Sequence, residues 1–253
     1  MPKIHDLKIK RSLYKNIQRI VDSMKMITVV KLRKNTQLMK HAQNFQNCFA
    51  SNLLTYSFLT NIKSNKTLNI LICLNRSLLC GNYLTSLNKL KQEEGDWVIL
   101  GSKLPVIFKR LFAKGANIIF NSPTTSNLSM IEALSELIFS KKEEYKQIIN
   151  YSWDASTGNA EKKVICTARE IEQKQLKYTN LTNDIGKEYM IGLLNLLIAN
   201  AMTMEEKRRL MCIDQASKNT EQIMKDLDKS INQARQAQIT NELNEVISGC
   251  EYL

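Results

Sequence analysis

Apolar or small residues recur every three or four positions in the last quarter of the chain. The residues of this stripe are Ile213, Ala216, Thr220, Ile223, Leu227, Ile231 and Ala234. Their spacing places them on one side of an α-helix, and its persistence over several turns is typical of a coiled-coil seam. No Pro interrupts the span from Glu188 to Cys250. A helix of this span is roughly 95 Å long, more than the width of a globular domain of this size, so we expect it to extend beyond its own core.

The first part of the chain has the same period. It appears at Leu13, Ile17, Ile20, Met24, Ile27 and Lys31. No Gly occurs before Gly81, and we expect one amphipathic helix from about Pro2 to Thr60. Two helices of this length are unstable in water unless each buries its stripe. The pattern therefore predicts that the terminal helices pack as an antiparallel coiled coil, with Ile17, Ile20 and Met24 in its core.

Between these helices, short apolar runs alternate with helical patterns. The runs lie at 68–74, 97–100 and 117–120, and the helical patterns end at Lys91 or cover 105–114 and 127–142. Two alternating segments, 145–153 and 163–168, are joined by turn residues and predict a hairpin. Strands that alternate with helices predict a small, Rossmann-like α/β domain with a mainly parallel sheet. With a polar connection at 171–184, we expect three parts: a helix in 1–63, an α/β domain in 64–183 and a helix in 184–253.

The composition excludes several classes of protein. Charged residues make up 24% of the 253 residues and hydrophobic residues 43%, which is typical of a soluble, folded protein. The longest apolar run, Tyr189 to Met202, is too short and too polar to span a bilayer, and no secretion signal is recognisable. The six Cys form no CxxC pair and only two His are present, so we expect no metal site and mostly buried, reduced thiols.

The charge is unevenly distributed. The net charge is +12, and residues 1–42 contain eleven Lys or Arg against two acids. This excess predicts a polyanionic partner, which could be nucleic acid, anionic lipid or an acidic protein surface. The basic helix has no aromatic residue between Tyr14 and Phe45 and no helix-turn-helix signature. We therefore favour an acidic protein partner, with a basic coiled-coil protein that binds nucleic acid as the alternative.

Catalytic and nucleotide-binding signatures are missing. The loop Asn75 to Gly81 is neither a GxGxxG nor a GxxxxGK[ST] loop. Gly101-Ser102-Lys103 resembles the end of a phosphate-binding loop, but the glycine expected five residues before Gly101 is replaced by Asp96. No GxSxG motif occurs. We expect no cofactor and no catalysis by the chain alone, and an enzyme built on the α/β domain is the weaker rival hypothesis.

Both ends carry specific motifs. Near the start, Lys15-Asn16-Ile17-Gln18-Arg19-Ile20, Ser23-Met24-Lys25-Met26 and Lys31-Leu32-Arg33-Lys34 follow one another. Near the end come Arg235-Gln236-Ala237, Ile239-Thr240, Glu242-Leu243 and Glu245-Val246-Ile247-Ser248-Gly249. Together they resemble the gamma subunit of the rotary, F-type ATP synthase, whose final helix reads R-Q-A-x-I-T-x-E-L-x-E-I. Arg209-Leu210-Met211 resembles the family's A-R-M segment, and Leu79-Cys80-Gly81 its G-L-C-G turn.

The resemblance implies a rotor subunit of the central stalk, which couples rotation of a membrane ring to conformational change at catalytic sites on other subunits. Its implied partners are the alpha/beta catalytic hexamer, an epsilon-type rotor subunit and the membrane ring of c subunits, with no nucleic acid, metal or cofactor. It implies a peripheral membrane location, on the cytoplasmic face of a bacterial membrane or the matrix face of the mitochondrial inner membrane.

By position in these motifs, the resemblance implies eight residues that contact the stator. They are Met24, Lys25, Arg33, Arg209, Arg235, Gln236, Thr240 and Glu242. Arg235 can make a bidentate contact with a carboxylate, and Gln236 and Thr240, four apart, share a helix face. The chain is shorter than is usual for the family, and the difference is expected between Ser122 and Asp184.

Overall fold

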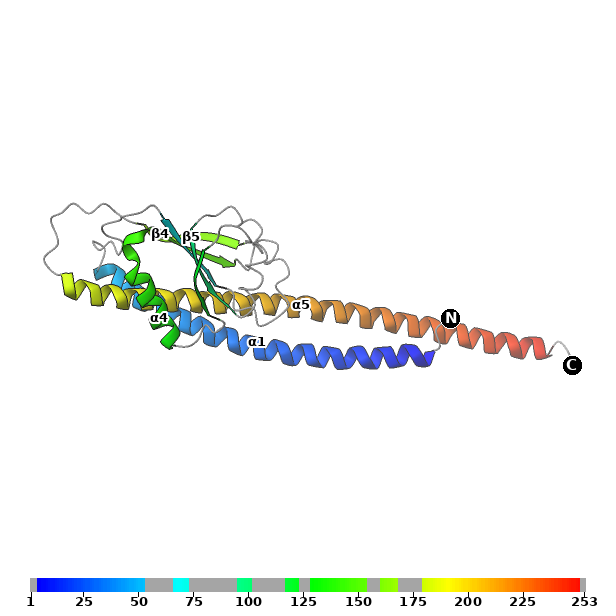
Figure 1. Cartoon of the computed structure of the whole chain (residues 1–253). Helices are drawn as coiled ribbons and strands as arrows, with labels where there is room; N and C mark the ends of the chain where they lie inside the picture. Colours follow the sequence, from blue (N-terminus) through cyan, green and yellow to red (C-terminus); the bar gives the residue numbers. More distant parts are fainter. Residues whose placement is uncertain are drawn as a thin grey trace. The chain divides into compact units, whose positions relative to one another are not determined.

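The computed structural model describes residues 4–52, 66–72, 95–101, 117–122, 128–153, 160–167 and 179–250 (Figure 1). The chain forms two compact units. We call Met1–Val30 with Arg209–Leu253 the helical unit, and Lys31–Arg208 the sheet unit. Among the described residues, no helix has a stretch both long and apolar enough to cross a bilayer.

Two long helices run through the chain, as the periodicity predicts. Helix α1 covers Ile4–Asn52 and helix α5 covers Thr179–Cys250. The prediction of a polar connection up to Asp184 is wrong, because α5 begins at Thr179. Once the apolar turns after Lys187 are helical, each further residue adds one backbone hydrogen bond, so a polar segment without Pro continues the helix.

The seam predicted for α1 lies on the wrong face of the helix. Ile20 and Met24 are exposed, at 60% and 53%, and of the predicted stripe only Ile17 is half-buried. In the helical unit the buried or half-buried residues of α1 are Ile4, Leu7, Tyr14, Ile17, Gln18, Val21, Thr28 and Val29. This helix carries apolar residues on two faces. The period identifies a helix but cannot tell which of its faces packs against the partner helix.

The seam of α5 is predicted more accurately. Ile213 and Thr220 are buried, and Leu227, Ile231 and Ala234 are half-buried. Ala216 and Ile223 are exposed, and the half-buried Ser217 and Met224 take their places. The buried positions are thus spaced alternately by four and three residues, which is the repeat of a coiled coil.

The sheet unit contains a five-stranded sheet with the order β3-β2-β1-β4-β5. Its strands are β1 (Lys66–Ile72), β2 (Asp96–Leu100), β3 (Asn117–Ser122), β4 (Tyr145–Trp153) and β5 (Ala160–Thr167). The first four are parallel, and β5 pairs antiparallel with β4. The mainly parallel sheet and the hairpin are confirmed. Strands β1 and β2 read as continuous apolar runs because both of their faces are buried.

One face of the sheet packs against α4 (Leu128–Ser140) and α5. The core there consists of Leu68, Ile70, Ile72, Val98, Leu100, Met130, Ile131, Leu134, Ile138, Tyr145, Ile148, Met190, Leu193, Leu194, Leu197 and Ile198. A short 3₁₀-helix η2 (Lys142–Glu144) follows α4. The helices expected up to Lys91 and in 105–114 lie outside the described residues.

Helices α1 and α5 are also in contact within the sheet unit. The Gln46 side-chain amide, 7% exposed, donates to the Tyr189 carbonyl at 3.1 Å. At Gly192 an added Cβ would lie 2.4 Å from the Phe45 ring, so the two helices approach closely there. This contact fixes the pairing of the helices beside the sheet.

Three strands meet at a buried carboxylate. Asp96, 6% exposed at the start of β2, accepts hydrogen bonds from Asn117 Nδ2 and from the Tyr145 hydroxyl, both at 2.9 Å. Burial and this hydrogen bond raise the pKa of the Tyr145 hydroxyl above its ordinary value, so the hydroxyl remains a donor to Asp96. Gly95 precedes the carboxylate with φ of +127°, a conformation that L side chains rarely adopt.

Gly95→Ala should destabilise the sheet unit by roughly 1–3 kcal/mol or more, because the backbone conformation favours Gly and the added Cβ would lie 2.3 Å from the Thr67 carbonyl oxygen. Urea unfolding of the full chain, followed by Trp fluorescence, measures this change. Equal midpoints for the variant and the wild type would contradict the close approach.

Ile223→Pro should break α5 in the helical unit, because the ring removes one backbone hydrogen bond and clashes with the preceding turn, at a cost of about 3 kcal/mol or more. Ile223→Ala is the matched control, since Ile223 is 37% exposed and its truncation removes little packing. Circular dichroism at the helix band during thermal unfolding compares the two. A Pro variant that melts like the Ala variant would argue against a continuous helix.

Candidate partner-binding surface of the helical unit

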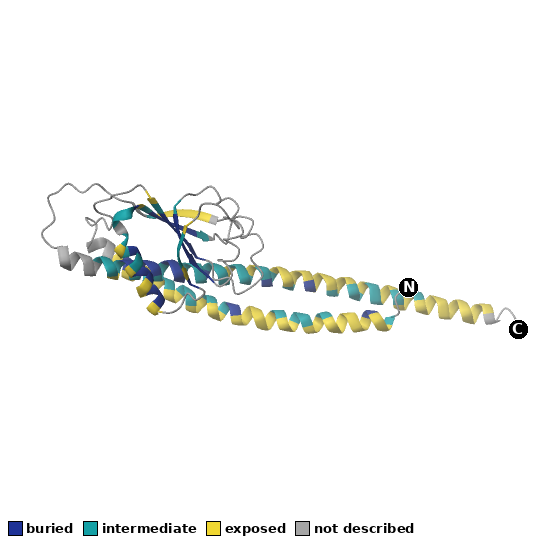
Figure 2. Ribbon diagram, in the orientation of Figure 1, coloured by how far each residue is buried: buried dark blue, intermediate teal, exposed yellow. Residues whose placement is uncertain are grey.

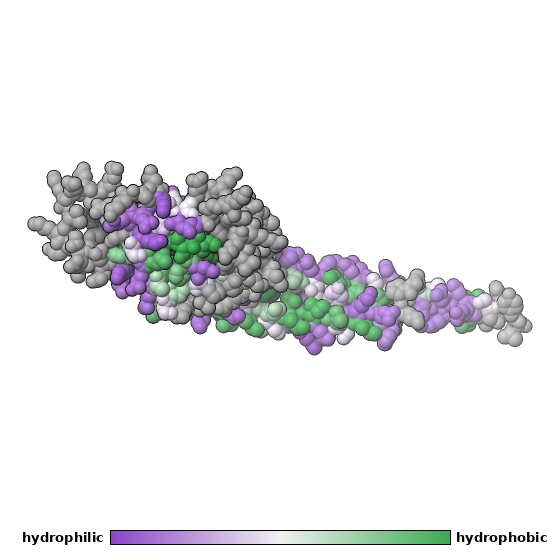
Figure 3. All heavy atoms as spheres, viewed as in Figure 1, coloured by the Kyte–Doolittle hydropathy of each residue, from purple (hydrophilic) through white to green (hydrophobic). Residues whose placement is uncertain are grey.

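An apolar stripe lies on α1 outside the seam. Its residues are Ile9, Leu13, Ile20, Met24 and Ile27, each between 53% and 60% exposed. At 100° per residue all five fall within about one sixth of a turn. In Figure 3 hydrophobic residues gather over the α1 side of the helix pair. A stripe of this regularity, left in water by the partner helix, is typical of a surface that binds another protein.

A second apolar surface lies at the end of α5. Every residue from Gln238 to Ser248 is exposed (Figure 2), including four large apolar side chains. These are Ile239, Leu243, Val246 and Ile247, between 48% and 64% exposed. Their spacing places them on one side of the helix. We call this group the tip stripe.

The predicted residues of the last motif surround the tip stripe. On a helical wheel Arg235 and Glu242, seven apart, lie along one border, and Gln236 and Thr240 lie along the other. All four are exposed. Thr240 Oγ1 donates to the Gln236 carbonyl at 3.0 Å, and Glu242 Oε1 accepts from Gln238 Nε2 at 2.8 Å. These bonds are within one helix, so the side chains form an apolar strip with polar margins.

The remaining predicted residues do not form one cluster. Met24 belongs to the exposed stripe of α1, whereas Lys25 binds Asp214 of α5, with 2.7 Å between Nζ and Oδ1. That ion pair raises the pKa of the Lys25 ammonium above its ordinary value. Arg209 is half-buried in the helical unit, and Arg33 is exposed on the part of α1 that belongs to the sheet unit.

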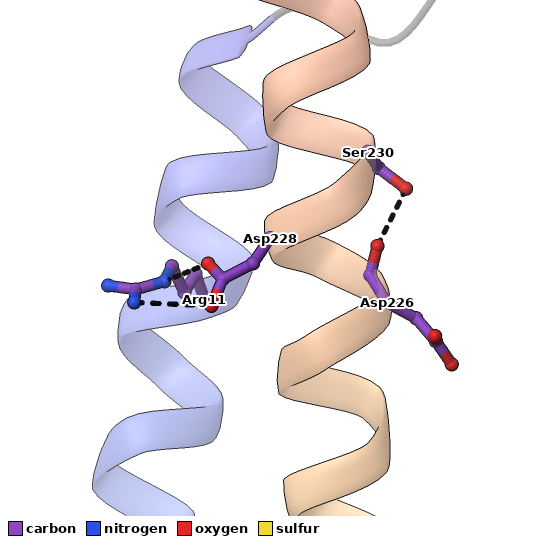
Figure 4. Close-up of polar contacts among 4 residues, drawn as sticks. All are labelled: Arg11, Asp226, Asp228 and Ser230. Carbon is purple, nitrogen blue, oxygen red and sulfur yellow. Dashed lines mark hydrogen bonds and ion pairs between the residues drawn. The ribbon is translucent and has the colours of Figure 1, made fainter.

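Polar contacts between the helices are a feature that the hydrophobic pattern does not predict. Arg11 forms a two-pronged ion pair with Asp228, in which Nη2 donates to Oδ2 at 3.3 Å (Figure 4). Hydrogen bonding to Asp228 raises the pKa of the Arg11 guanidinium. Gln18 Nε2 donates to Ser217 Oγ at 2.9 Å. The seven-residue spacing of positions 11, 18 and 25 is a signal for these contacts, but the more regular apolar stripe on another face of α1 was interpreted as the seam.

No group of three or more His, Cys, Asp or Glu among the described residues could hold a metal ion. The loop Asn75 to Gly81 and the residues Ser102 and Lys103 lie outside the described part of the chain. Of the two cysteines whose burial is described, Cys212 is half-buried and Cys48 is exposed. The expectation of buried thiols at the other four positions stays a prediction. The surfaces of the helical unit are suited to binding a protein.

Comparisons with known proteins agree with this organisation. The sequence pattern of a family described as ATP synthase matches residues 3–253. The mitochondrial ATP synthase subunit gamma of Drosophila melanogaster is 27% identical over 284 residues, covering 98% of this chain and 89% of the relative. The ATP synthase gamma chain of Sulfurovum sp. (strain NBC37-1) is 24% identical over 301 residues, covering 99% of this chain and 99% of the relative.

Solved structures share the fold. A chain of the Euglena gracilis mitochondrial ATP synthase, from a cryo-EM structure of OSCP/F1/c-ring, superposes with a TM-score of 0.62 at 16% identity, over 98% of this chain and 93% of that one. A chain of the Tetrahymena thermophila mitochondrial ATP synthase central stalk/c-ring gives 0.56 at 17% identity, over 78% and 99%. The family assignment leaves the nucleic-acid-binding alternative without support. Matched over almost its whole length, the chain belongs to the family of the gamma subunit of the F-type ATP synthase.

Proposed function

We propose that this chain is the central-stalk rotor subunit of an ATP synthase and performs no catalysis of its own. It transmits rotation of a membrane ring of c subunits to catalytic sites on an alpha/beta hexamer. The sheet unit contacts the ring and an epsilon-type rotor subunit, and the helical unit turns inside the hexamer. The chain is peripheral to the membrane, on the cytoplasmic face of a bacterial membrane or the matrix face of the mitochondrial inner membrane.

The observation that carries this proposal is the unpartnered apolar surface of the helical unit. The stripe of α1 and the tip stripe are exposed although the two helices already pack against each other. A rotating shaft needs surfaces that slide against a surrounding collar, and apolar contacts suit this because they are not directional. Charged and polar residues at the margins, such as Arg235 and Glu242, then supply contacts that depend on rotary angle.

The charge of α1 fits the same partner. Lys8, Lys15 and Arg19 are exposed together on another face of α1, outside the apolar stripe. An acidic protein surface around the shaft would attract this cationic face, and the attraction would weaken with salt.

Reconstitution with the alpha and beta subunits of the same source tests the function directly. The chain should co-purify with an alpha/beta hexamer in a single copy, and ATP hydrolysis should rotate it. A chain that fails to enter the hexamer while remaining folded would contradict the proposal.

Arg235→Ala should weaken coupling, because a charge-assisted bidentate hydrogen bond contributes roughly 1.5–3 kcal/mol, or about tenfold or more in the contact it stabilises. The ratio of ATP-driven proton pumping to ATP hydrolysis measures coupling in the reconstituted complex. Arg235→Lys keeps the charge without the planar fork and should be intermediate. Unchanged coupling in the Ala variant would remove Arg235 from the contact.

Leu243→Asp with Val246→Asp should reduce assembly with the hexamer, because two charges would interrupt the tip stripe where it meets an apolar collar. Asn241→Asp with Ser248→Asp adds the same charge on the opposite side of the helix and is the matched control. Co-purification yield compares the two pairs. Equal losses would indicate that charge alone, and not the apolar stripe, controls assembly.

A further inference from the structure

The polar contacts between the helices form a regular series. Arg11, Gln18 and Lys25 follow one another at intervals of seven along α1, and Asp214, Glu221 and Asp228 do so along α5. Because the helices are antiparallel, position 11 faces 228 and position 25 faces 214, as the two ion pairs show. The middle position 18 is neutral and binds Ser217.

These pairs lie at the margin of the seam and contribute little by burial. Their side chains are between 41% and 48% exposed, and exposed ion pairs stabilise a fold only slightly. Their regular placement suggests a different role, because charges beside a coiled coil select which residues of the partner helix they face.

We propose that Arg11–Asp228 and Lys25–Asp214 fix the register of the two helices in the helical unit and oppose sliding by one heptad. A slip of seven residues again brings seam positions opposite seam positions, so apolar packing opposes it only weakly. The two ion pairs form only in the native register, so they distinguish it from the slipped register. In the sheet unit, the hydrogen bond from Gln46 and the close approach at Gly192 fix the register of the same two helices.

The sequence places a like charge at a slipped position within the helical unit. The residue seven after Asp228 is Arg235, which a slip in one direction brings opposite Arg11. In that arrangement Lys25 faces Glu221 instead of Asp214, and the attraction between Arg11 and Asp228 is replaced by repulsion between Arg11 and Arg235. Specificity of this kind depends on penalising the alternative as well as favouring the native pair.

The register can be measured in the full chain by disulfide formation. Gln18→Cys with Ser217→Cys places two thiols where the native side chains are in contact at 2.9 Å. Equilibration in glutathione buffers, followed by peptide mass spectrometry, gives the effective concentration of this thiol pair and separates it from the native cysteines.

Reversing both cations, by Arg11→Asp and Lys25→Asp, should lower that effective concentration about threefold or more, because both native attractions become repulsions. Adding Asp228→Arg and Asp214→Lys should restore it, since the opposite charges then face each other again. The matched control is Lys8→Asp with Lys15→Asp, which changes the net charge equally at exposed positions seven apart.

Each outcome decides the proposal. A drop in the reversed variant, recovery in the compensated variant and no drop in the control establish that the facing charges fix the register. An unchanged reversed variant, an equal drop in the control, or a compensated variant that does not recover would overturn it. If the reversed variant loses helical circular dichroism, recovery of the compensated variant still distinguishes pairing from a general loss of folding. The isolated chain suffices, so failure here would leave the rotor proposal untouched.

Discussion

The structure depends on the burial of narrow stripes between two very long helices. Helix α5 has 72 residues and α1 has 49, and neither is stable in water without a packed face. In the sheet unit α5 also packs its apolar turns from Met190 to Ile198 against the sheet. In the helical unit the seam is thinner and includes Thr28, Gln18 and Thr220, so polar contacts between the helices accompany the apolar ones.

This thin seam explains why so much apolar surface is left outside it. Two helices in contact cover only one face of each, and the stripe from Ile9 to Ile27 and the tip stripe lie on other faces. A third element has to cover them if they are to leave water. In the proposed rotor that element is the surrounding hexamer, while the seam holds the two helices together as one shaft. The seam therefore joins the two helices to each other, and the exposed stripes of the same helices are left to bind the partner.

The contrast between the two units follows from their chemistry. The sheet unit is held by a large apolar core and by Asp96, whose carboxylate joins β2, β3 and β4 through Asn117 and Tyr145. Removing a partner from such a buried network leaves an unsatisfied polar group. The helical unit has half-exposed ion pairs, each of which contributes little to stability. Their positions matter more, because they select which residues of the two helices face each other.

The sequence by itself determined the long helices, the mainly parallel sheet, the hairpin and, through its terminal motifs, the family. These features follow from local periodicity and from residues close together in the chain. Only the tertiary structure decided which face of α1 meets α5, because Leu13, Ile20 and Met24 have the same period as the true seam and are left exposed. It also decided that Lys25 faces Asp214 and that Arg11 faces Asp228, since these contacts join residues about 190 to 220 positions apart, beyond the reach of any local pattern.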